Sequence, residues 1–316
     1  MKRLTTTFLA GVFGLALATS ALAQADKPLT ILESVPGLNF PFFVHMMNQM
    51  KAEAEGLGNI TVIESDGQDQ TTKQTADVET AITQGVDGIV ISPKAVDAMA
   101  PALQQAVDAG IPVVTIDRRV DNVPDILAHV GADNVKGGEA QGELIMKLFP
   151  DGANIINLLG SPGASPAIDR AQGLHNILDP VADKYKFVFE QTANFNRADG
   201  LSVTESALGG MDGPPDVIVA GNDDMALGAI EALKARNYEG VTVIGFDALP
   251  EALVAVRDGS LTATVEQFPG GQSRGAVQAL VKFLREGVEP EKLVLLTPIA
   301  ITKDNLDAAE RIGEVQ

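Results

Sequence analysis

The chain has 316 residues, no cysteine, no tryptophan and a formal net charge of −19. The absence of cysteine excludes disulfides and thiol chemistry, and the strong acidity argues against nucleic acids and anionic membrane surfaces as partners. A chain of this length buries most of its apolar surface and normally forms two domains.

The first residues have the features of a secretory signal peptide. Lys2 and Arg3 give a positive start, an apolar stretch runs from Phe8 to Ala18, and small residues stand at Ala21 and Ala23. The apolar stretch is too short to anchor the chain in a bilayer. We therefore expect cleavage after Ala23, removal of residues 1–23, and a mature protein that is free in the periplasm of a two-membrane bacterium.

Strand and helix patterns alternate over residues 29–130. The helical pattern from Ala95 to Ala109 places Val96, Met99 and Leu103 on one face. Such alternation predicts parallel βαβ units with right-handed crossovers. The expected strands are residues 29–32, 60–63, 88–91, 113–116 and 126–130.

The same alternation returns over residues 133–265, with its clearest helix from Met225 to Arg236. The tail adds a helix over 275–285 and an extended run over 293–302. No flexible linker separates the halves, so the sequence predicts an α/β protein of two doubly wound parallel-sheet lobes. The expected strands here are residues 154–158, 187–190, 217–219, 241–244 and 262–265.

Three of these strands end in polar residues. Asp117 and Arg118 follow one, Asn222 begins the run after the second, and Asp247 follows the third. In open parallel sheets, ligands bind outside the carboxyl ends of the strands. Carboxylate, guanidinium and amide groups suit a ligand with many hydroxyls. The alternative is that Asp and Asn cap the following helices, and the pair Asp223-Asp224 favours the start of a helix in the same way.

Patterns typical of other chemistry are missing from the sequence. The three histidines, His45, His129 and His175, form no zinc motif, and Ser161 and Ser165 lie in no nucleophile elbow. No glycine-rich phosphate loop occurs. We expect no metal, no cofactor and no enzymatic activity.

Several short segments, in this order and spacing, are shared with a known family: Pro41-Phe42-Phe43-Val44, Thr115-Ile116-Asp117-Arg118, Val130-Gly131-Ala132-Asp133-Asn134, Asn222 to Gly228, Gly245-Phe246-Asp247 and Ala263 to Gln267. Over nearly its whole mature length the chain resembles the periplasmic sugar-binding proteins of ABC importers, in the ribose-type branch. The stretch Val243 to Gln267 is similar to inositol-binding members. The resemblance implies a type I periplasmic binding protein whose lobes are joined by a three-crossing hinge. It places an N-terminal lobe at 26–131 plus 267–297 and a C-terminal lobe at 132–266 plus 298–316.

The resemblance also implies which residues bind ligand. Phenylalanine faces would cover the C–H faces of a sugar ring, and carboxylates held ionised by arginine would accept its hydroxyls. The implied set is Phe42, Phe43, Asp117, Arg118, Arg170, Phe195, Asn222, Asp247 and Gln267. The simpler alternatives are that Phe42 and Phe43 are core residues, that Arg118 bridges Asp117 structurally, and that Arg170 is a solvated helix charge.

Three further candidates mark departures from the ribose-type pattern. Phe40 stands where an asparagine commonly precedes Pro-Phe-Phe, with Asn39 one position earlier, and Ser92 ends a strand that often ends in asparagine. These changes favour another pentose, a small sugar, a polyol or a cyclitol such as inositol over ribose itself.

The implied function is capture of one neutral monosaccharide or polyol between two closing lobes and its delivery to the membrane permease of an ABC importer, by a monomer. Two alternatives stay open. One is an exported sugar-acting enzyme that uses Asp117 or Asp247 as acid or base, and the other is a sugar sensor module for a chemoreceptor or sensor kinase.

Overall fold

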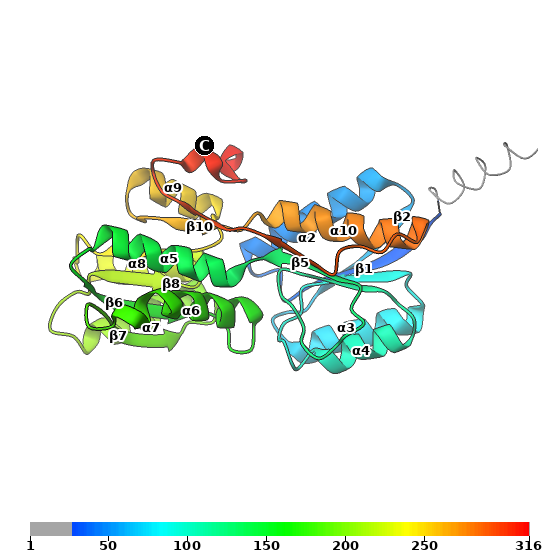
Figure 1. Cartoon of the computed structure of the whole chain (residues 1–316), viewed down its shortest axis with the longest axis horizontal. Helices are drawn as coiled ribbons and strands as arrows, with labels where there is room; N and C mark the ends of the chain where they lie inside the picture. The colour runs from blue at the N-terminus through cyan, green and yellow to red at the C-terminus, as the bar shows by residue number, and fades with distance from the viewer. Residues whose placement is uncertain (1–26, 316) are drawn as a thin grey trace, which may run out of the picture.

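The computed structural model describes residues 27–315, so the predicted signal peptide and its cleavage site after Ala23 lie outside the described residues. The chain folds into two α/β lobes that lie side by side, with the C-terminal segment above the second lobe (Figure 1). The predicted fold class, two parallel-sheet α/β lobes, is confirmed.

The first lobe is built on a six-stranded parallel sheet in the order β11-β5-β4-β3-β1-β2. Successive residues of β1 point to opposite faces of the sheet, as the two-residue period of a strand requires. Ile31 packs with the cluster under α2 and α10, and Leu32 packs with the cluster under α3 and α4. Both faces of the sheet are therefore covered (Figure 1). The elements are β1 (Leu29–Val35), α2 (Pro41–Leu57), β2 (Ile60–Asp66), α3 (Thr71–Gln84), β3 (Gly88–Ile91), α4 (Ala100–Asp108), β4 (Val113–Ile116), β5 (Ala128–Ala132), α10 (Pro269–Glu286) and β11 (Leu293–Leu296).

The second lobe has a four-stranded parallel sheet in the order β7-β6-β8-β9. Neighbouring residues of β6 again point to opposite faces: Ile155 packs with α5 and α6, and Ile156 with the cluster that includes α7 and α8. The elements are α5 (Asn134–Leu148), β6 (Ala153–Leu159), α6 (Ser165–Leu178), the 3-10 turn Asp179–Val181, β7 (Tyr185–Thr192), α7 (Arg197–Gly209), β8 (Val217–Ala220), α8 (Asp223–Ala235), β9 (Thr242–Ile244) and α9 (Pro250–Asp258).

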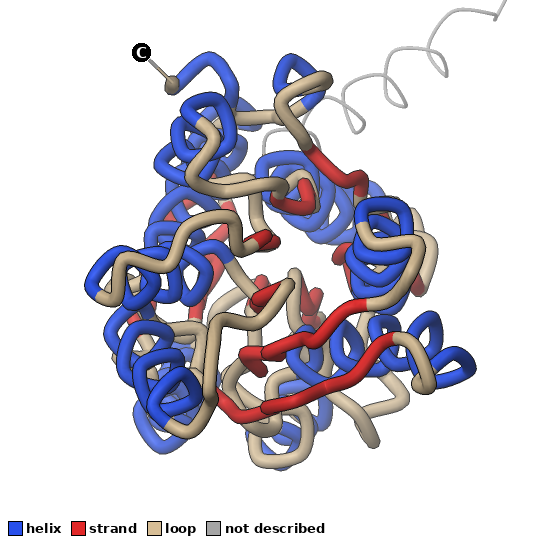
Figure 2. The backbone as a smooth tube through the Cα atoms, turned by 90° about the vertical axis from the view of Figure 1, so that its left-hand side faces the viewer, coloured by secondary structure: helices blue, strands red, loops and turns tan. Residues whose placement is uncertain are grey.

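The chain passes between the two sheets three times: from β5 to α5, from β10 (Thr264–Glu266) to α10, and from β11 to β12 (Ile299–Ile301). β10 and β12 pair antiparallel and form a small sheet of their own. The crossings are tied together, because the backbone N–H of Asp133 donates to the carbonyl of Leu296 at 2.9 Å. Two 3-10 turns, Leu306–Ala308 and Ile312–Glu314, end the described chain. Figure 2 views these layers at right angles to Figure 1.

Two sequence expectations were wrong in detail. The helix expected from Ala95 begins only at Ala100, because Pro101 is tolerated in the first turn of a helix but not in its interior. The extended run expected over residues 293–302 is divided at Thr297-Pro298 into β11, in the first-lobe sheet, and β12, which pairs with β10. The predicted bounds of the two lobes stay a prediction.

Candidate ligand-binding site

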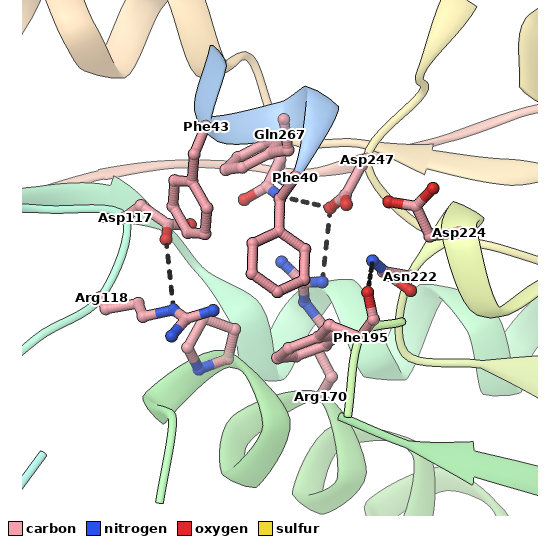
Figure 3. Close-up of a pocket in the computed structure, with 12 residues that line it drawn as sticks. Phe40, Phe43, Asp117, Arg118, Arg170, Phe195, Asn222, Asp224, Asp247 and Gln267 are labelled. Atoms are coloured by element: carbon pink, nitrogen blue, oxygen red, sulfur yellow. Dashed lines mark hydrogen bonds and ion pairs between the residues drawn. The ribbon is translucent and has the colours of Figure 1, made fainter. Parts of the chain in front are cut away.

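A small cavity lies where the two lobes meet (Figure 3). Its lining combines aromatic rings with three carboxylates and two guanidinium groups, and it draws on both halves of the chain. The lining residues are Phe40, Phe42, Phe43, Asp117, Arg118, Pro166, Arg170, Phe195, Asn222, Asp224, Asp247 and Gln267. All nine residues in the predicted set are in this lining, as is Phe40.

The polar residues reach the cavity because the backbone turns sharply where the strands end. Asp117 follows β4 with φ 60°, and Asp247 follows β9 with φ 108°. A non-glycine residue at positive φ costs of the order of 1 kcal/mol or more, and such conformations gather at functional sites. The turns aim both carboxylates between the lobes.

Three phenylalanine rings at the start of α2 form the aromatic wall of the first lobe. The ring of Phe43 meets those of Phe40 and Phe42 edge to face, at centroid distances of 6.0 and 5.3 Å. Pro41 stands in the first turn of α2, where its fixed φ favours the start of a helix. The rings belong to the hydrophobic core and also face the cavity, so the core alternative and the site prediction describe the same side chains.

The guanidinium of Arg118 contacts both Asp117 and the aromatic ring of Phe43. Its Nε lies 3.8 Å from Oδ2 of Asp117, and its guanidinium carbon lies 5.1 Å from the ring centroid of Phe43 and 5.7 Å from that of Phe195. Nη1 donates to the carbonyl of Lys94 at 3.1 Å, whereas Nε has no hydrogen-bond partner within the described chain. Burial raises the pKa of Asp117 in spite of Arg118.

Arg170 is anchored more firmly, on the second lobe. Its Nε donates to Oδ1 of Asn134 at 2.8 Å, and its Nη1 donates to the carbonyl of Gly221 at 2.6 Å and to Oδ1 of Asp247 at 3.4 Å. The guanidinium stacks 3.6 Å from the ring centroid of Phe246, which is fully buried behind the cavity. Arg170 is only 5% exposed, so it is no solvated helix charge.

Two glycines make room for these side chains. A Cβ atom at Gly138 of α5 would lie 2.1 Å from the carbonyl oxygen of Arg170, so only glycine lets α5 approach α6 so closely. A Cβ atom at Gly160 would lie 2.1 Å from the ring of Phe195. The close helix packing and the position of Phe195 therefore both depend on glycine.

Asp247 connects the second lobe to the segment between β10 and α10, which contains Gln267. Its Oδ1 accepts from Nε2 of Gln267 at 2.6 Å as well as from Arg170. Burial raises the pKa of this carboxyl to about 7, Arg170 opposes the shift, and Asp117 adds to it. Desolvation therefore opposes the ionisation that pairing with arginine favours, and at Asp247 it is the larger effect.

Asn222 caps a helix and faces the cavity at once. Its Oδ1 accepts from the backbone N–H of Met225 at 3.0 Å, and its Nδ2 donates to the carbonyl of Phe195 at 3.3 Å. One N–H and one lone pair of the amide stay available. Asp223 lies outside the cavity lining, where its carboxylate accepts from the hydroxyl of Thr264 and the backbone N–H of Leu249.

Two of the further candidates lie outside the cavity lining. Ser92 stands behind Asp117 and donates its hydroxyl to Oδ2 of that residue at 3.1 Å. Asn39 lines outer cavities at the rim between the lobes. Sequence reasoning missed Pro166 and Asp224, which do line the cavity. Asp224 stands in the first turn of the helix that follows β8, and this position at a strand's carboxyl end was the available signal.

The lobes also touch away from the three crossings. The backbone N–H of Val96 donates to the carbonyl of Gly163 at 2.9 Å, and that of Arg119 donates to the hydroxyl of Ser165 at 3.0 Å. The guanidinium of Arg119 forms an ion pair with Asp169. These contacts join the two lobes and close the cavity, so its polar lining is almost fully buried except for Asp224, which is half-buried.

Known proteins with a similar sequence or structure share this arrangement of two lobes. Residues 32–287 match the family of periplasmic binding protein domains. The chain is 42% identical over 245 residues to the ribose import binding protein of Bacillus subtilis (strain 168), covering 77% of each chain. It is 36% identical over 288 residues to the ribose import binding protein of Escherichia coli (strain K12), covering 90% of this chain and 93% of the relative. It superposes on the solved structure of Caulobacter myo-inositol binding protein, bound to myo-inositol, with a TM-score of 0.88 and 40% identity, over 91% of this chain and 97% of that one.

Proposed function

The chain belongs to the family of periplasmic binding protein domains, and on that premise we propose that it captures one neutral monosaccharide or polyol between its lobes and delivers it to the permease of an ABC importer. The observation that carries the proposal is the buried cavity, whose aromatic walls and hydrogen-bonding groups come from both lobes. Its relatives include importer binding proteins for ribose and a binding protein for myo-inositol, which bracket the size and polarity of the ligand. The protein acts in the periplasm, after cleavage of the signal peptide at Ala23.

The aromatic residues suit the flat faces of a ring. Phe42 and Phe43 cover one side from the first lobe, and Phe195 lies on the second lobe across the same cavity. A sugar or cyclitol ring presents C–H groups on its faces and hydroxyls around its edge, so aromatic faces bury the first and leave the second for hydrogen bonds. The ring then lies between Phe43 and Phe195.

The polar residues suit the hydroxyls around that ring. The carboxylates of Asp117 and Asp247 accept hydrogen bonds from hydroxyls, while Arg118 and Arg170 donate hydrogen bonds to hydroxyl oxygens. Bonds of this kind to ionised groups are about twice as strong as neutral ones. Asn222 and Gln267 line the same cavity, and their amide groups can both donate and accept hydrogen bonds.

Ligand binding then shifts an equilibrium between open and closed lobes. The contacts of Val96 with Gly163 and of Arg119 with Asp169 exist only while the lobes are together. A ligand held by both lobes favours the closed form, and moving the population from 1:99 to 99:1 takes about 5.5 kcal/mol of preference for that form. Several charge-assisted bonds supply a preference of this size.

The first test is a thermal-shift screen of the mature protein against pentoses, hexoses, pentitols and inositols. A ligand present at a thousand times its dissociation constant stabilises the protein by about 4 kcal/mol, which raises the melting temperature by several degrees. Denatured protein is analysed in parallel by mass spectrometry to detect ligand carried through purification. A shift with one sugar or one stereochemical set supports the proposal. No shift and no carried ligand would overturn it.

One observation favours the enzyme alternative. The pKa of Asp247, raised to about 7, is the value that a general acid or base needs near neutral pH. Against this, Asp247 is held by Arg170 and Gln267, and the relatives are transport binding proteins. Incubation of the protein with each sugar that binds, followed by chromatography for products, separates the two functions.

A further inference from the structure

Asp224 is the one carboxylate in the cavity lining without a partner among residues 27–315. Asp117 is paired with Arg118 and Asp247 with Arg170, but the carboxylate of Asp224 makes no hydrogen bond and no ion pair within the described chain. Figure 3 shows it turned toward the carboxylate of Asp247. With three carboxylates and two guanidinium groups, the lining carries one acid in excess.

The nearest cation does not neutralise that excess. Arg197 attracts Asp224, but its Nε is bound to Glu231 at 2.8 Å and its Nη1 to Glu251 at 2.9 Å, outside the cavity lining. Burial raises the pKa of Asp224 to about 6, with Arg197 opposing and Glu251 adding to the shift, so this carboxyl is mostly ionised at neutral pH. Asp224 is half-buried, so its charge is only partly solvated, and a cation supplied by the ligand would give it a partner.

Aromatic rings lie beside the same carboxylate. Phe40 and Phe195 share with Asp224 both the cavity lining and an outer cavity at the rim. An ammonium group is attracted to the faces of such rings as well as to a carboxylate. Asp224 also raises the pKa of Asp247, so one ammonium placed beside these two carboxylates would relieve the repulsion between them.

We propose that Asp224 determines specificity, by allowing the cavity to bind a ring that carries an ammonium group, an amino sugar or an aminocyclitol, more tightly than the matching neutral ring. The inference rests on the proposed function, because it places the amine of a ring ligand in the same cavity. It adds a class of ligand, and a residue that selects it, to the capture of neutral polyols.

The experiment compares matched ligand pairs by isothermal titration calorimetry at pH 7. The pairs are D-glucose with D-glucosamine, D-galactose with D-galactosamine, and myo-inositol with an aminodeoxyinositol. The readout is the ratio of the two affinities within each pair. We expect the amine to bind about tenfold more tightly in at least one pair, since its bond to Asp224 is charge-assisted on both sides.

Two variants show whether Asp224 is responsible. Asp224→Asn should reduce the ratio to about one, because the amide keeps the shape and loses the charge. Asp199→Asn is the matched control: it makes the same change in net charge at an outer cavity and should leave the ratio unchanged.

The outcomes separate this inference from the proposed function. Binding of a neutral ring without tighter binding of any amine overturns the inference and leaves the proposed function standing. A preference for the amine that persists in Asp224→Asn overturns the role of Asp224. Binding of neither member of any pair overturns this inference, whereas the proposed function is decided separately by the thermal-shift screen, which also covers pentoses and pentitols.

Discussion

The two lobes hold their arginines in different ways. Arg170 donates to Asn134, Gly221 and Asp247 and stacks on Phe246, all within the second lobe. Arg118 has one hydrogen bond, to the carbonyl of Lys94, a long contact with Asp117, and two aromatic neighbours, one of them across the cleft. The second-lobe half of the site therefore keeps its geometry when the lobes part, whereas the first-lobe half is completed by closure.

The largest expected effect comes from Asp247→Ala, which removes the acceptor of the preorganised half. Nε2 of Gln267 and Nη1 of Arg170 lose a partner, and the ligand loses a charged acceptor. Affinity for the ligand identified by the screen should fall by about 3 kcal/mol, roughly 150-fold, in calorimetry. Asp247→Asn serves as the folding control, because it keeps an acceptor for Gln267. Unchanged affinity in the alanine variant would remove Asp247 from the site.

Replacing the two arginines in turn tests the contrast between the lobes directly. Arg170→Met should lower the free energy of unfolding of the ligand-free protein by about 3 kcal/mol, since it leaves Asp247 buried without its cation. Arg118→Met should cost about half as much, because its ion pair is longer and it has fewer hydrogen bonds to lose. Urea denaturation measures both, and equal losses would contradict the contrast.

The two lobes also differ in how they hold a buried acid, Glu33 in the first lobe and Asp223 in the second. Glu33 on β1 is fully buried, with both oxygens unpartnered within the described chain, and burial raises its pKa to about 8, whereas Asp223 is held by Thr264 and Leu249. A raised folded-state pKa means that the folded protein binds a proton that the unfolded chain has released. Stability is therefore lost as pH rises from about 4.5 to about 8.

Glu33→Gln should remove that loss. At pH 8 the variant should be more stable than the wild type by about 2 kcal/mol, and at pH 5 the two should be nearly equal. Urea denaturation at the two pH values is the measurement. If the variant and the wild type differed in stability by the same amount at pH 5 and pH 8, the shape of the side chain rather than its ionisation would be responsible.

The last prediction concerns the pH dependence of affinity. A hydroxyl donates to the ionised form of Asp247, so a bound ligand favours ionisation, and the ligand-free carboxyl takes up a proton as pH falls through about 7. The dissociation constant should rise as pH falls from 8 to 5, by at most about tenfold per pH unit below 7. Asp247→Asn should flatten the calorimetric profile around pH 7, and a wild-type profile that is already flat would contradict the role of this carboxyl.

The sequence predicted the parts of the fold and site that follow from local pattern. Strands β3 and β4 appear at the expected residues, and Asp117, Asn222 and Asp247 meet because parallel strands end at the same edge. The raised pKa of Asp247 was missed because it depends on how deeply closure buries the group. Ser92 was a further candidate because it ends a strand that often ends in asparagine in the ribose-type pattern, but its hydroxyl turns to Asp117.

Asp224 was missed for a related reason. A helix-start aspartate is usually a solvated charge, and the sequence does not show that this one lines a cavity together with Phe40 of the opposite lobe. The division of residues 293–302 at Pro298 likewise follows from the path of the chain between lobes rather than from the residues themselves.

The contact between the lobes at Gly163 makes the protein suitable as an optical sensor. Pro162, beside it, is exposed and lines an outer cavity with Lys94 of the other lobe. Because the chain has no cysteine, Pro162→Cys would introduce a single thiol, and a fluorophore attached there would change its surroundings each time the cleft closes. Ligand concentration could then be followed by emission, without a second label or an added reagent.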